Sequence, residues 1–304
     1  MKKFKKILPN LLIGLVFLVG LGIFAYPTIS DQWNKYHQSR AIASYEDQVE
    51  NMSEEDFSAA WAAAEEYNAT ITQNTFDGDA FSQEEKNLRN TPYWSVLNLS
   101  DNGLMGYISV PKIKQKLPIY HGTSDGVLQI AAGHLSGTKL PIGGEGCHSV
   151  IAAHRGLPSA KLFSDLDKMK VGDKFYIHVL DKTLAYQVDQ IMPMVDKNDT
   201  ETLTNAMQNV EGQDYVTLFT CTPYGINSHR YLVRGVRTEY HGEDDEKVSD
   251  ETMLQSIQEY YMLYALLVVA ILLLCFTTFK MVKRRRHNSQ ECPRREKNEK
   301  NEGK

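Results

Sequence analysis

The sequence predicts a mainly β domain, a barrel or sandwich with a few short helices, preceded by a helical region and enclosed by two membrane-spanning helices. Three observations support this fold class. Two long apolar runs without charged residues lie near the ends of the 304-residue chain. A stretch of strong helix formers follows the first run. From about residue 106, short apolar or alternating segments recur between Gly, Pro and Asp residues, as strands separated by turns do.

The first apolar run, residues 7–26, is predicted to be a signal anchor. About 20 residues without charge suffice for a helix that crosses a bilayer. The preceding residues 1–6 are rich in lysine, and basic flanks stay in the cytoplasm. A cleaved signal peptide is the alternative, which is disfavoured because the run is long and no Ala-x-Ala site follows it.

A second span is predicted at residues 261–279, followed by a basic tail at residues 280–304. Both termini are therefore expected in the cytoplasm, with roughly residues 27–260 outside the membrane. The outer segment is acidic, so it would repel the phosphates of a nucleic acid. We therefore expect no nucleic-acid partner, and we expect the tail to meet anionic membrane lipid.

Residues 27–99 are expected to form a helical stalk or brace. The run from Ala59 to Glu66 consists almost wholly of strong helix formers. Ser53 is the expected N-cap of this helix, and the acidic residues 54–56 fill its first turn, where they suit the positive end of the helix dipole. No catalytic grouping is present in this part.

The β domain is expected over residues 100–240, with a linker at residues 241–260 before the second span. Gly, Pro and Asp residues, which favour turns, separate the predicted strands. They cover residues 106–113, 117–120, 149–154, 174–180, 183–189, 214–221 and 231–238. Short helices are expected at residues 162–169 and 202–209.

The last two strands are expected to form a hairpin that brings Cys221 and Arg230 together. Residues 214–221 alternate as a strand does, and residues 222–228 carry the Pro and Gly of a turn. Antiparallel pairing then sets Cys221 beside Arg230 at the mouth of the hairpin. A thiol beside a guanidinium is a candidate nucleophile, because nearby positive charge favours the thiolate.

A cysteine nucleophile also needs an acid that protonates the leaving amine, and histidine serves this role best near neutral pH. His154 ends an apolar strand and is followed by a tight loop, whereas His134 lies in a glycine-flanked segment. Spacing alone leaves the choice open among His121, His134, His148, His154, His178, His229 and His241.

Two other roles for these side chains compete with catalysis. Only Cys147 and Cys221 fall in the outer segment, so a disulfide between them could belong to a non-enzymatic two-pass receptor or scaffold. Two cysteines are too few for a disulfide-dense scaffold, which disfavours this role. A zinc site would draw on His134, Cys147, His148 and His154, but these lack the paired spacings of a closed site.

Several motifs occur in order along residues 100–238. They are residues 117–123 (LPIYHGT), 133–138 (GHLSGT), 140–144 (LPIGG), 153–156 (AHRG) and 217–221 (TLFTC), together with Arg230. In this set the chain resembles the sortases, cysteine transpeptidases of Gram-positive cell surfaces. The resemblance implies a sortase-type eight-stranded β-barrel with no metal or cofactor. It also implies Cys221 as nucleophile, His154 as general acid/base and Arg230 as the cation that positions substrate and stabilises the oxyanion.

The long region before the barrel and the C-terminal span resemble class C, the pilin-polymerising sortases. These carry a lid with an Asp-Pro-aromatic motif. We expect Asp79 and Phe81 to form the lid here, because the acid could pair with Arg230 and the ring could cover the thiol. The proline of the motif is missing, which puts lid rigidity in doubt. Thr91-Pro92-Tyr93 is a rival with the proline but no acid, and an ordinary polar linker is a further alternative.

The implied reaction cleaves a Leu-Pro-x-Thr-Gly-like sorting signal between Thr and Gly through a thioacyl enzyme. Expected partners are pilin subunits that bear this signal and an acceptor lysine, and membrane lipid. A housekeeping sortase that uses a cell-wall precursor as the acceptor is the alternative. The resemblance therefore implies a membrane-bound enzyme with its catalytic domain outside the cell.

Overall fold

The computed structural model describes residues 8–75, 79, 81 and 88–242, and the isolated positions 265, 268, 269, 271 and 280. The chain divides into two compact units, residues 1–25 with 252–304, and residues 26–251. The second unit holds the β domain. The predicted linker and the predicted second span at residues 261–279 lie outside the described residues, apart from these isolated positions and residues 241 and 242.

The first apolar run forms part of a long helix, α2 (Leu8–Glu50). Within the described residues, this is the one helix long and apolar enough to cross a membrane. We expected the helix to end near residue 26, but it continues for about 24 further residues. The reason lies in packing, because Ile42 and Tyr45 of α2 are buried against Leu104 and Tyr107 of the β domain.

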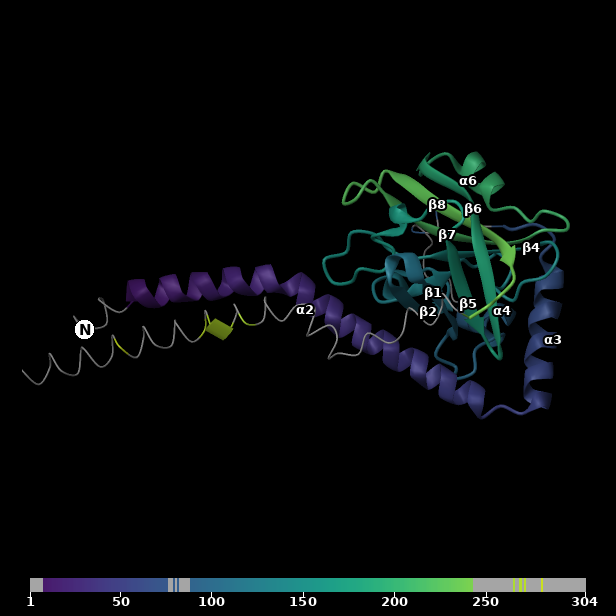
Figure 1. Cartoon of the computed structure of the whole chain (residues 1–304), viewed down its shortest axis with the longest axis horizontal. Coiled ribbons are helices and arrows are strands. Elements are labelled where there is room, and N and C mark those ends of the chain that lie inside the picture. Colours follow the sequence, from purple (N-terminus) through teal and green to yellow (C-terminus); the bar gives the residue numbers. More distant parts are fainter. Residues whose placement is uncertain are drawn as a thin grey trace, which may run out of the picture. The chain divides into compact units, whose positions relative to one another are not determined.

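The β domain is a closed eight-stranded barrel with the strand order β1-β2-β3-β4-β7-β8-β6-β5 (Figure 1). The strand pattern of the sequence did not distinguish a barrel from a sandwich, and the structure shows a barrel. The strands are β1 (Leu104–Val110), β2 (Gln115–His121), β3 (Ala132–His134), β4 (Cys147–Ala152), β5 (Lys174–Val179), β6 (Lys182–Asp196), β7 (Asp214–Thr222) and β8 (His229–Thr238).

Two of the strand pairings are parallel, and one of them positions the candidate site. The pair β2 and β3 and the pair β4 and β7 run in the same direction, while the other neighbours are antiparallel. Parallel neighbours bring their C-terminal ends to the same edge of a sheet. The residues that follow β4 therefore lie beside the end of β7.

The strands predicted from the sequence are present, although several of their ends differ. Strand β4 ends at Ala152, two residues before the predicted end at His154. Residues 111–113 form a 3-10 turn, η2 (Pro111–Ile113), because Pro111 cannot donate a ladder hydrogen bond. The prediction missed β3, which has only three residues. Strand β6 runs seven residues beyond the predicted end, with register shifts that accommodate its length.

The short helices join these strands. The predicted helices at residues 162–169 and 202–209 appear as η3 (Leu166–Lys168) and α6 (Thr200–Ala206). Three others were not predicted, η1 (Leu88–Asn90), α4 (Pro92–Ser95) and α5 (Asp125–Leu128). Each has four residues or fewer, which gives too short a window for helical periodicity to show.

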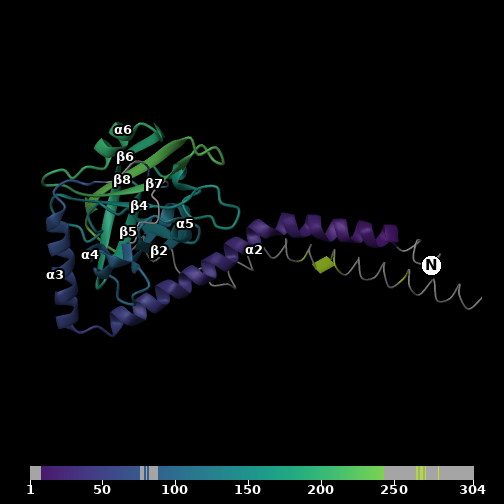
Figure 2. The ribbon, with the colours of Figure 1, turned by 180° about the vertical axis from the view of Figure 1, so that it is seen from behind.

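The helical region before the barrel packs against it. Helix α3 (Glu54–Thr70) has Ser53 as its N-cap, in a reciprocal capping box with Asp56. Asn68 then exchanges two hydrogen bonds with the backbone of Leu140, at 3.2 and 2.7 Å. The hydroxyl of Tyr45 on α2 donates to the carbonyl of Met105 and accepts from the amide of Leu180. Seen from behind, α2 and α3 enclose one side of the barrel (Figure 2).

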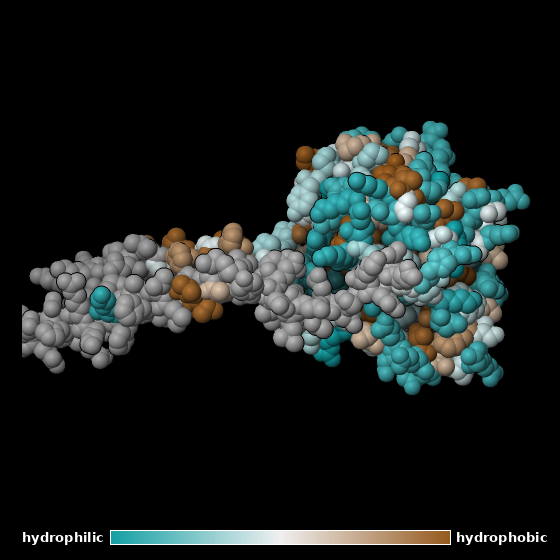
Figure 3. All heavy atoms as spheres, in the orientation of Figure 1, coloured by the Kyte–Doolittle hydropathy of each residue, from teal (hydrophilic) through white to brown (hydrophobic). Residues whose placement is uncertain are grey.

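The barrel interior holds the main hydrophobic core, built from inward-facing side chains of most strands. Phe175 and Tyr186 stack within it, with ring centroids 5.6 Å apart. The visible outer face of the barrel is mostly hydrophilic with scattered hydrophobic residues (Figure 3). The β domain therefore forms a rigid support from which loops and strand ends present polar groups.

Candidate active site

The hairpin of β7 and β8 brings Cys221 and Arg230 together, as the sequence predicted. The two residues are direct partners in the antiparallel register. Both are buried, at 4% exposure each. The guanidinium is also held by the carbonyl oxygens of Asn227 and His229, to which Nη1 donates at 3.0 and 2.9 Å. The cation is thus fixed at the mouth of the hairpin next to the thiol.

His154 reaches the same place through the parallel pairing of β4 with β7. Ala152 is the partner of Phe219, and the amide of Ala153 donates to the Phe219 carbonyl at 3.1 Å. The hydroxyl of Thr220 donates to the Ala153 carbonyl at 2.7 Å. Continuing this register by two residues sets His154 level with Cys221. Three residues from three strand ends therefore converge.

Asp79 forms a two-point ion pair with Arg230. The guanidinium Nε donates to one carboxylate oxygen at 2.6 Å, and Nη2 donates to the other. Only 5% of the Arg230 side chain and 11% of the Asp79 side chain are exposed. Two parallel charge-assisted bonds of this kind are among the stronger polar contacts in proteins. The carboxylate therefore occupies the face of the guanidinium that could receive an anion.

Phe81 covers the same site from one side. Its ring stacks on the imidazole of His154 at 5.1 Å between centroids and on Phe219 at 5.7 Å. The guanidinium carbon of Arg230 lies 5.3 Å from the centre of the ring. Asp79 and Phe81, two residues apart in the chain, thus contact the cation and the histidine of the site.

The electrostatics of the thiol differ from the prediction. The pKa of Cys221 is raised to about 11, chiefly by burial; Arg230 and Lys197 act to lower it, and Asp79 acts to raise it. We expected Arg230 to lower the pKa of Cys221 and so to favour the thiolate, but the opposite effect of burial on this pKa is larger. Burial also lowers the pKa of His154, and Arg230 lowers it too, while Asp125 acts to raise it. With Asp79 in place, the thiol holds its proton and the imidazole is neutral near pH 7.

Sequence reasoning missed a second arginine that ties the strand ends together. Arg155, directly after His154, forms an ion pair with Asp167 at 2.5 Å. Its Nη1 also donates to the hydroxyl of Thr222 at 3.4 Å, one residue beyond Cys221. The one signal in the sequence was the position of Arg155 directly after His154, in the segment Ala153-His154-Arg155-Gly156. The partners of Arg155 could not be predicted from sequence spacing.

The disulfide alternative is wrong for this structure. Cys147 pairs with Asp214 at the start of β7, whereas Cys221 lies near the end of that strand. At about 3.3 Å per residue the two cysteines are roughly 23 Å apart, far beyond the reach of a disulfide. Both thiols are free and buried. The scaffold held by this bridge is therefore excluded.

Two of the other histidine candidates, His134 and His148, are occupied elsewhere. His134 uses both ring nitrogens, with the Tyr93 hydroxyl at 2.7 Å and the Lys139 carbonyl at 2.9 Å. His148 likewise meets the Gln208 carbonyl and the Thr217 hydroxyl, both at 2.8 Å. These bonds leave no ring nitrogen for zinc. They also place Tyr93, the ring of the rival lid segment, in the hydrophobic core.

A family model described as Sortase domain matches residues 108–238. Among solved structures, sortase C1 from Streptococcus agalactiae is 48% identical with a TM-score of 0.58, and the match covers 66% of this chain and all of that one. Sortase C of Streptococcus pneumoniae is 46% identical with a TM-score of 0.56, over 66% and 97% of the two chains. The chain belongs to the sortase family.

The matched region contains the converging residues of this sortase. Among curated relatives, Sortase A of Bacillus anthracis is 28% identical over 140 residues, or 45% of this chain and 61% of that protein. The chain thus matches less than two thirds of the length of this relative. The similarity to class C structures is higher and extends over nearly their whole length. The resemblance seen in the sequence is therefore confirmed at the level of the family and of its class C members.

Proposed function

We propose that this sortase is a cysteine transpeptidase that joins pilin subunits through a thioacyl intermediate. The observation that carries the proposal is the convergence of Cys221, Arg230 and His154 at the ends of β7, β8 and β4. These groups supply a nucleophile, a fixed cation and a proton carrier, the three parts that acyl transfer to an amine requires.

In the proposed first step, Cys221 gives its thiol proton to His154, and Sγ attacks the threonine carbonyl carbon of a Leu-Pro-x-Thr-Gly-like sorting signal. Arg230 stabilises the negative oxygen of the tetrahedral intermediate. The Thr–Gly bond then breaks, and His154 gives a proton to the departing glycine amine. The product of this step is a thioester between Cys221 and the sorting signal.

In the second step, an acceptor amine attacks the thioester and the Cys221 sulfur leaves. His154 takes the proton that the amine loses and passes it to the departing Cys221 sulfur, which returns both groups to their starting state for the next cycle. We propose a pilin lysine as the acceptor, so that the product is an isopeptide bond. The support is similarity to the sortase C of Streptococcus pneumoniae, whose structure bears on pilin substrate specificity, and to sortase C1 of a streptococcal pilus island.

Asp79 and Phe81 are proposed to act as a lid over this machinery. The carboxylate occupies the guanidinium that would otherwise meet the substrate, and the ring lies on the histidine. The lid must therefore leave before a sorting signal can bind. This role is consistent with the raised pKa of the covered thiol.

The cellular arrangement is also a proposal. The apolar part of α2 would anchor the enzyme in the membrane, and residues 261–279 would form a second span with both termini in the cytoplasm. The barrel would then face the outside, where sorting signals and pilin lysines are available.

Incubation of the purified enzyme with pilins tests the proposal. The Cys221→Ala variant is expected to form no covalent ladder on denaturing gels and no thioacyl adduct by mass spectrometry. Cys147→Ala is the matched control, because it removes the other buried thiol of the barrel and should keep activity. Covalent ladders formed by the Cys221→Ala variant would contradict the proposed mechanism.

The choice of acceptor separates this proposal from a housekeeping role. With the same sorting peptide, lysine-bearing pilin and a cell-wall precursor amine are offered in competition. Isopeptide product with the pilin lysine is expected to dominate. A product only with the wall precursor would retain the transpeptidase chemistry and overturn the pilin assignment.

A further inference from the structure

Helix α2 carries an exposed aromatic stripe directly after its apolar segment. Tyr26, Ile29, Trp33 and Tyr36 are 54%, 52%, 63% and 39% exposed. Their spacings of three and four residues place them along one face of the helix. Exposed large aromatic residues in a row are unusual on a surface that meets only water, and such patches mark sites of contact.

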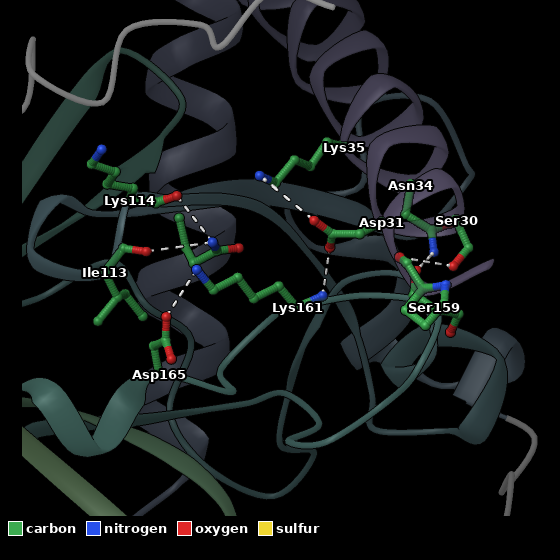
Figure 4. A network of polar contacts seen from close by, with 11 residues as sticks. Ser30, Asp31, Asn34, Lys35, Ile113, Lys114, Ser159, Lys161 and Asp165 are labelled. Carbon is green, nitrogen blue, oxygen red and sulfur yellow. Dashed lines mark hydrogen bonds and ion pairs between the residues drawn. The ribbon is translucent and has the colours of Figure 1, made fainter. Parts of the chain in front are cut away.

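The opposite face of the same segment is already occupied by the β domain. Asn34 donates to the carbonyl of Ser159 at 2.7 Å, and Asp31 accepts from the amide of Lys161 at 2.7 Å (Figure 4). One turn further, Gln38 donates to the carbonyl of Ile130 at 2.6 Å. These bonds fix the rotation of the helix, so the stripe faces away from the barrel.

The stripe has the chemistry of a membrane interface. Trp and Tyr are enriched at the headgroup level, where an apolar ring and a polar tip are both satisfied. Arg40 follows on the same face, with its Nη1 3.4 Å from the Tyr36 hydroxyl and its guanidinium carbon 5.9 Å from the Tyr36 ring. A cation at this position suits anionic headgroups. Tyr26 is the last residue of the apolar run, so the stripe begins where the span would leave the hydrocarbon.

We propose that the stripe formed by Tyr26, Ile29, Trp33 and Tyr36 lies in the headgroup region of the bilayer. The stripe rises about 15 Å along the helix, at 1.5 Å per residue. The polar region of one leaflet is only about 5–8 Å thick. A helix that crosses the hydrocarbon with residues 7–26 is too steep for this, so the proposal requires α2 to bend at Pro27. Residues 28–36 then run obliquely along the surface, with the stripe toward lipid and the barrel contacts toward water.

Lipid is favoured over a protein partner by two features. The stripe is continuous in sequence with the candidate span, and it ends on an arginine without an adjacent acid on that face. The proposal depends on membrane anchoring by α2 and is independent of the transpeptidase reaction.

Fluorescence of Trp33 tests this contact in the full chain. A variant with Trp61→Phe and Trp94→Phe retains Trp33 as its single tryptophan. It is reconstituted in vesicles of phosphatidylcholine and phosphatidylglycerol, in which part of the lipid carries bromine near the headgroup end of its chains. We expect blue-shifted emission and at least twofold quenching by this lipid, with weaker quenching when bromine lies near the methyl end.

The reference protein keeps Trp61 alone, because this residue lies on α3 and donates to Asp181. Its emission should be insensitive to brominated lipid. Water-like, unquenched emission from Trp33 would overturn the proposal. Blue-shifted but unquenched emission would also overturn it, since the stripe would then be covered by protein, either a second copy or another segment of this chain.

Discussion

At the scale of single residues, the pKa of Cys221 reflects both its burial and the ion pair beside it. Arg230 beside the thiol should favour the thiolate, but Asp79 takes up the guanidinium and burial adds a larger effect in the opposite direction. The pKa of about 11 therefore describes the covered thiol. Removal of the Asp79 charge leaves Arg230 free to lower it.

Asp79→Asn is predicted to shift the thiol toward reactivity at lower pH. Loss of the carboxylate removes one cause that raises the pKa of Cys221, so the midpoint of the alkylation rate against pH should fall by about one unit. At pH 7.5 this corresponds to roughly tenfold faster alkylation. The rate of iodoacetamide labelling, followed by mass spectrometry, measures this change.

A second ion pair on the same strand provides the control. Asp189 binds Arg234 of β8 through both Nε and Nη2, in a geometry like that of Asp79 with Arg230. Asp189→Asn should leave the labelling profile of Cys221 unchanged. Equal profiles for wild type and Asp79→Asn would show that the carboxylate does not control the thiol.

At the scale of elements, the pairing of β4 with β7 decides which histidine joins the cysteine. The β7–β8 hairpin is local in sequence, so its alternation and turn residues were enough to predict that Cys221 meets Arg230. The partner of β7 on its other side lies far earlier in the chain, and no local pattern encodes that choice. His154 was therefore selected by family resemblance, while His134 and His148 looked equally suitable by spacing.

Thr220→Val tests this strand pairing. The substitution removes the hydroxyl that donates to the Ala153 carbonyl and leaves that buried acceptor without its partner. We expect a loss of about 1–3 kcal/mol in the free energy of unfolding. We also expect kcat to fall by roughly tenfold, since His154 follows Ala153 directly and acyl transfer is sensitive to small displacements.

Thr217→Val is the matched control three residues earlier on the same strand, where Thr217 pairs with Val150 of β4. It removes the hydroxyl bonded to His148, so it should lower stability to a similar degree while kcat at the permissive temperature stays near wild type. Denaturant unfolding and peptide cleavage, measured side by side, separate the two effects. Equal loss of kcat in both variants would argue against a positioning role for the Thr220 bond.

At the scale of the whole molecule, buried neutral histidines should limit stability in acid. Burial lowers the pKa of His134 to about 3 and that of His148 to about 4, from an ordinary value of 6.5. A folded-state pKa below the unfolded one contributes stability that is complete above pH 6.5 and is lost as pH falls toward the folded value. We expect the free energy of unfolding to drop by ~1.4 kcal/mol per pH unit for each histidine between about pH 6 and pH 4.

Urea unfolding of the enzyme in detergent at several pH values measures this slope. His148→Asn should be less stable at pH 7.5 but show a shallower decline in acid, because one titrating group has been removed. A flat profile for wild type over this range would contradict the assignment of both histidines as neutral.

Some features of the architecture could be predicted from the sequence, and others could not. The mainly β domain, the α3 capping box at Ser53 and the apolar start of α2 follow from local composition and period. The continuation of α2 to Glu50 does not, because it depends on packing between distant segments. The contact of Asp79 with Arg230 was expected only through the resemblance to class C sortases, since no local pattern encodes it. Asp79 and Arg230 are 151 residues apart in the chain.

If Asp79 acts as the proposed lid, its contact with Arg230 would make the enzyme its own competitive inhibitor. The tethered carboxylate would compete with a sorting signal at a fixed effective concentration, however dilute the enzyme is. If the site is uncovered in about 1% of molecules, the apparent dissociation constant of a ligand is about 100-fold weaker than its intrinsic value. Screens for inhibitors on the intact chain would therefore overlook compounds that bind the uncovered site well, and a variant without the carboxylate is the better screening target.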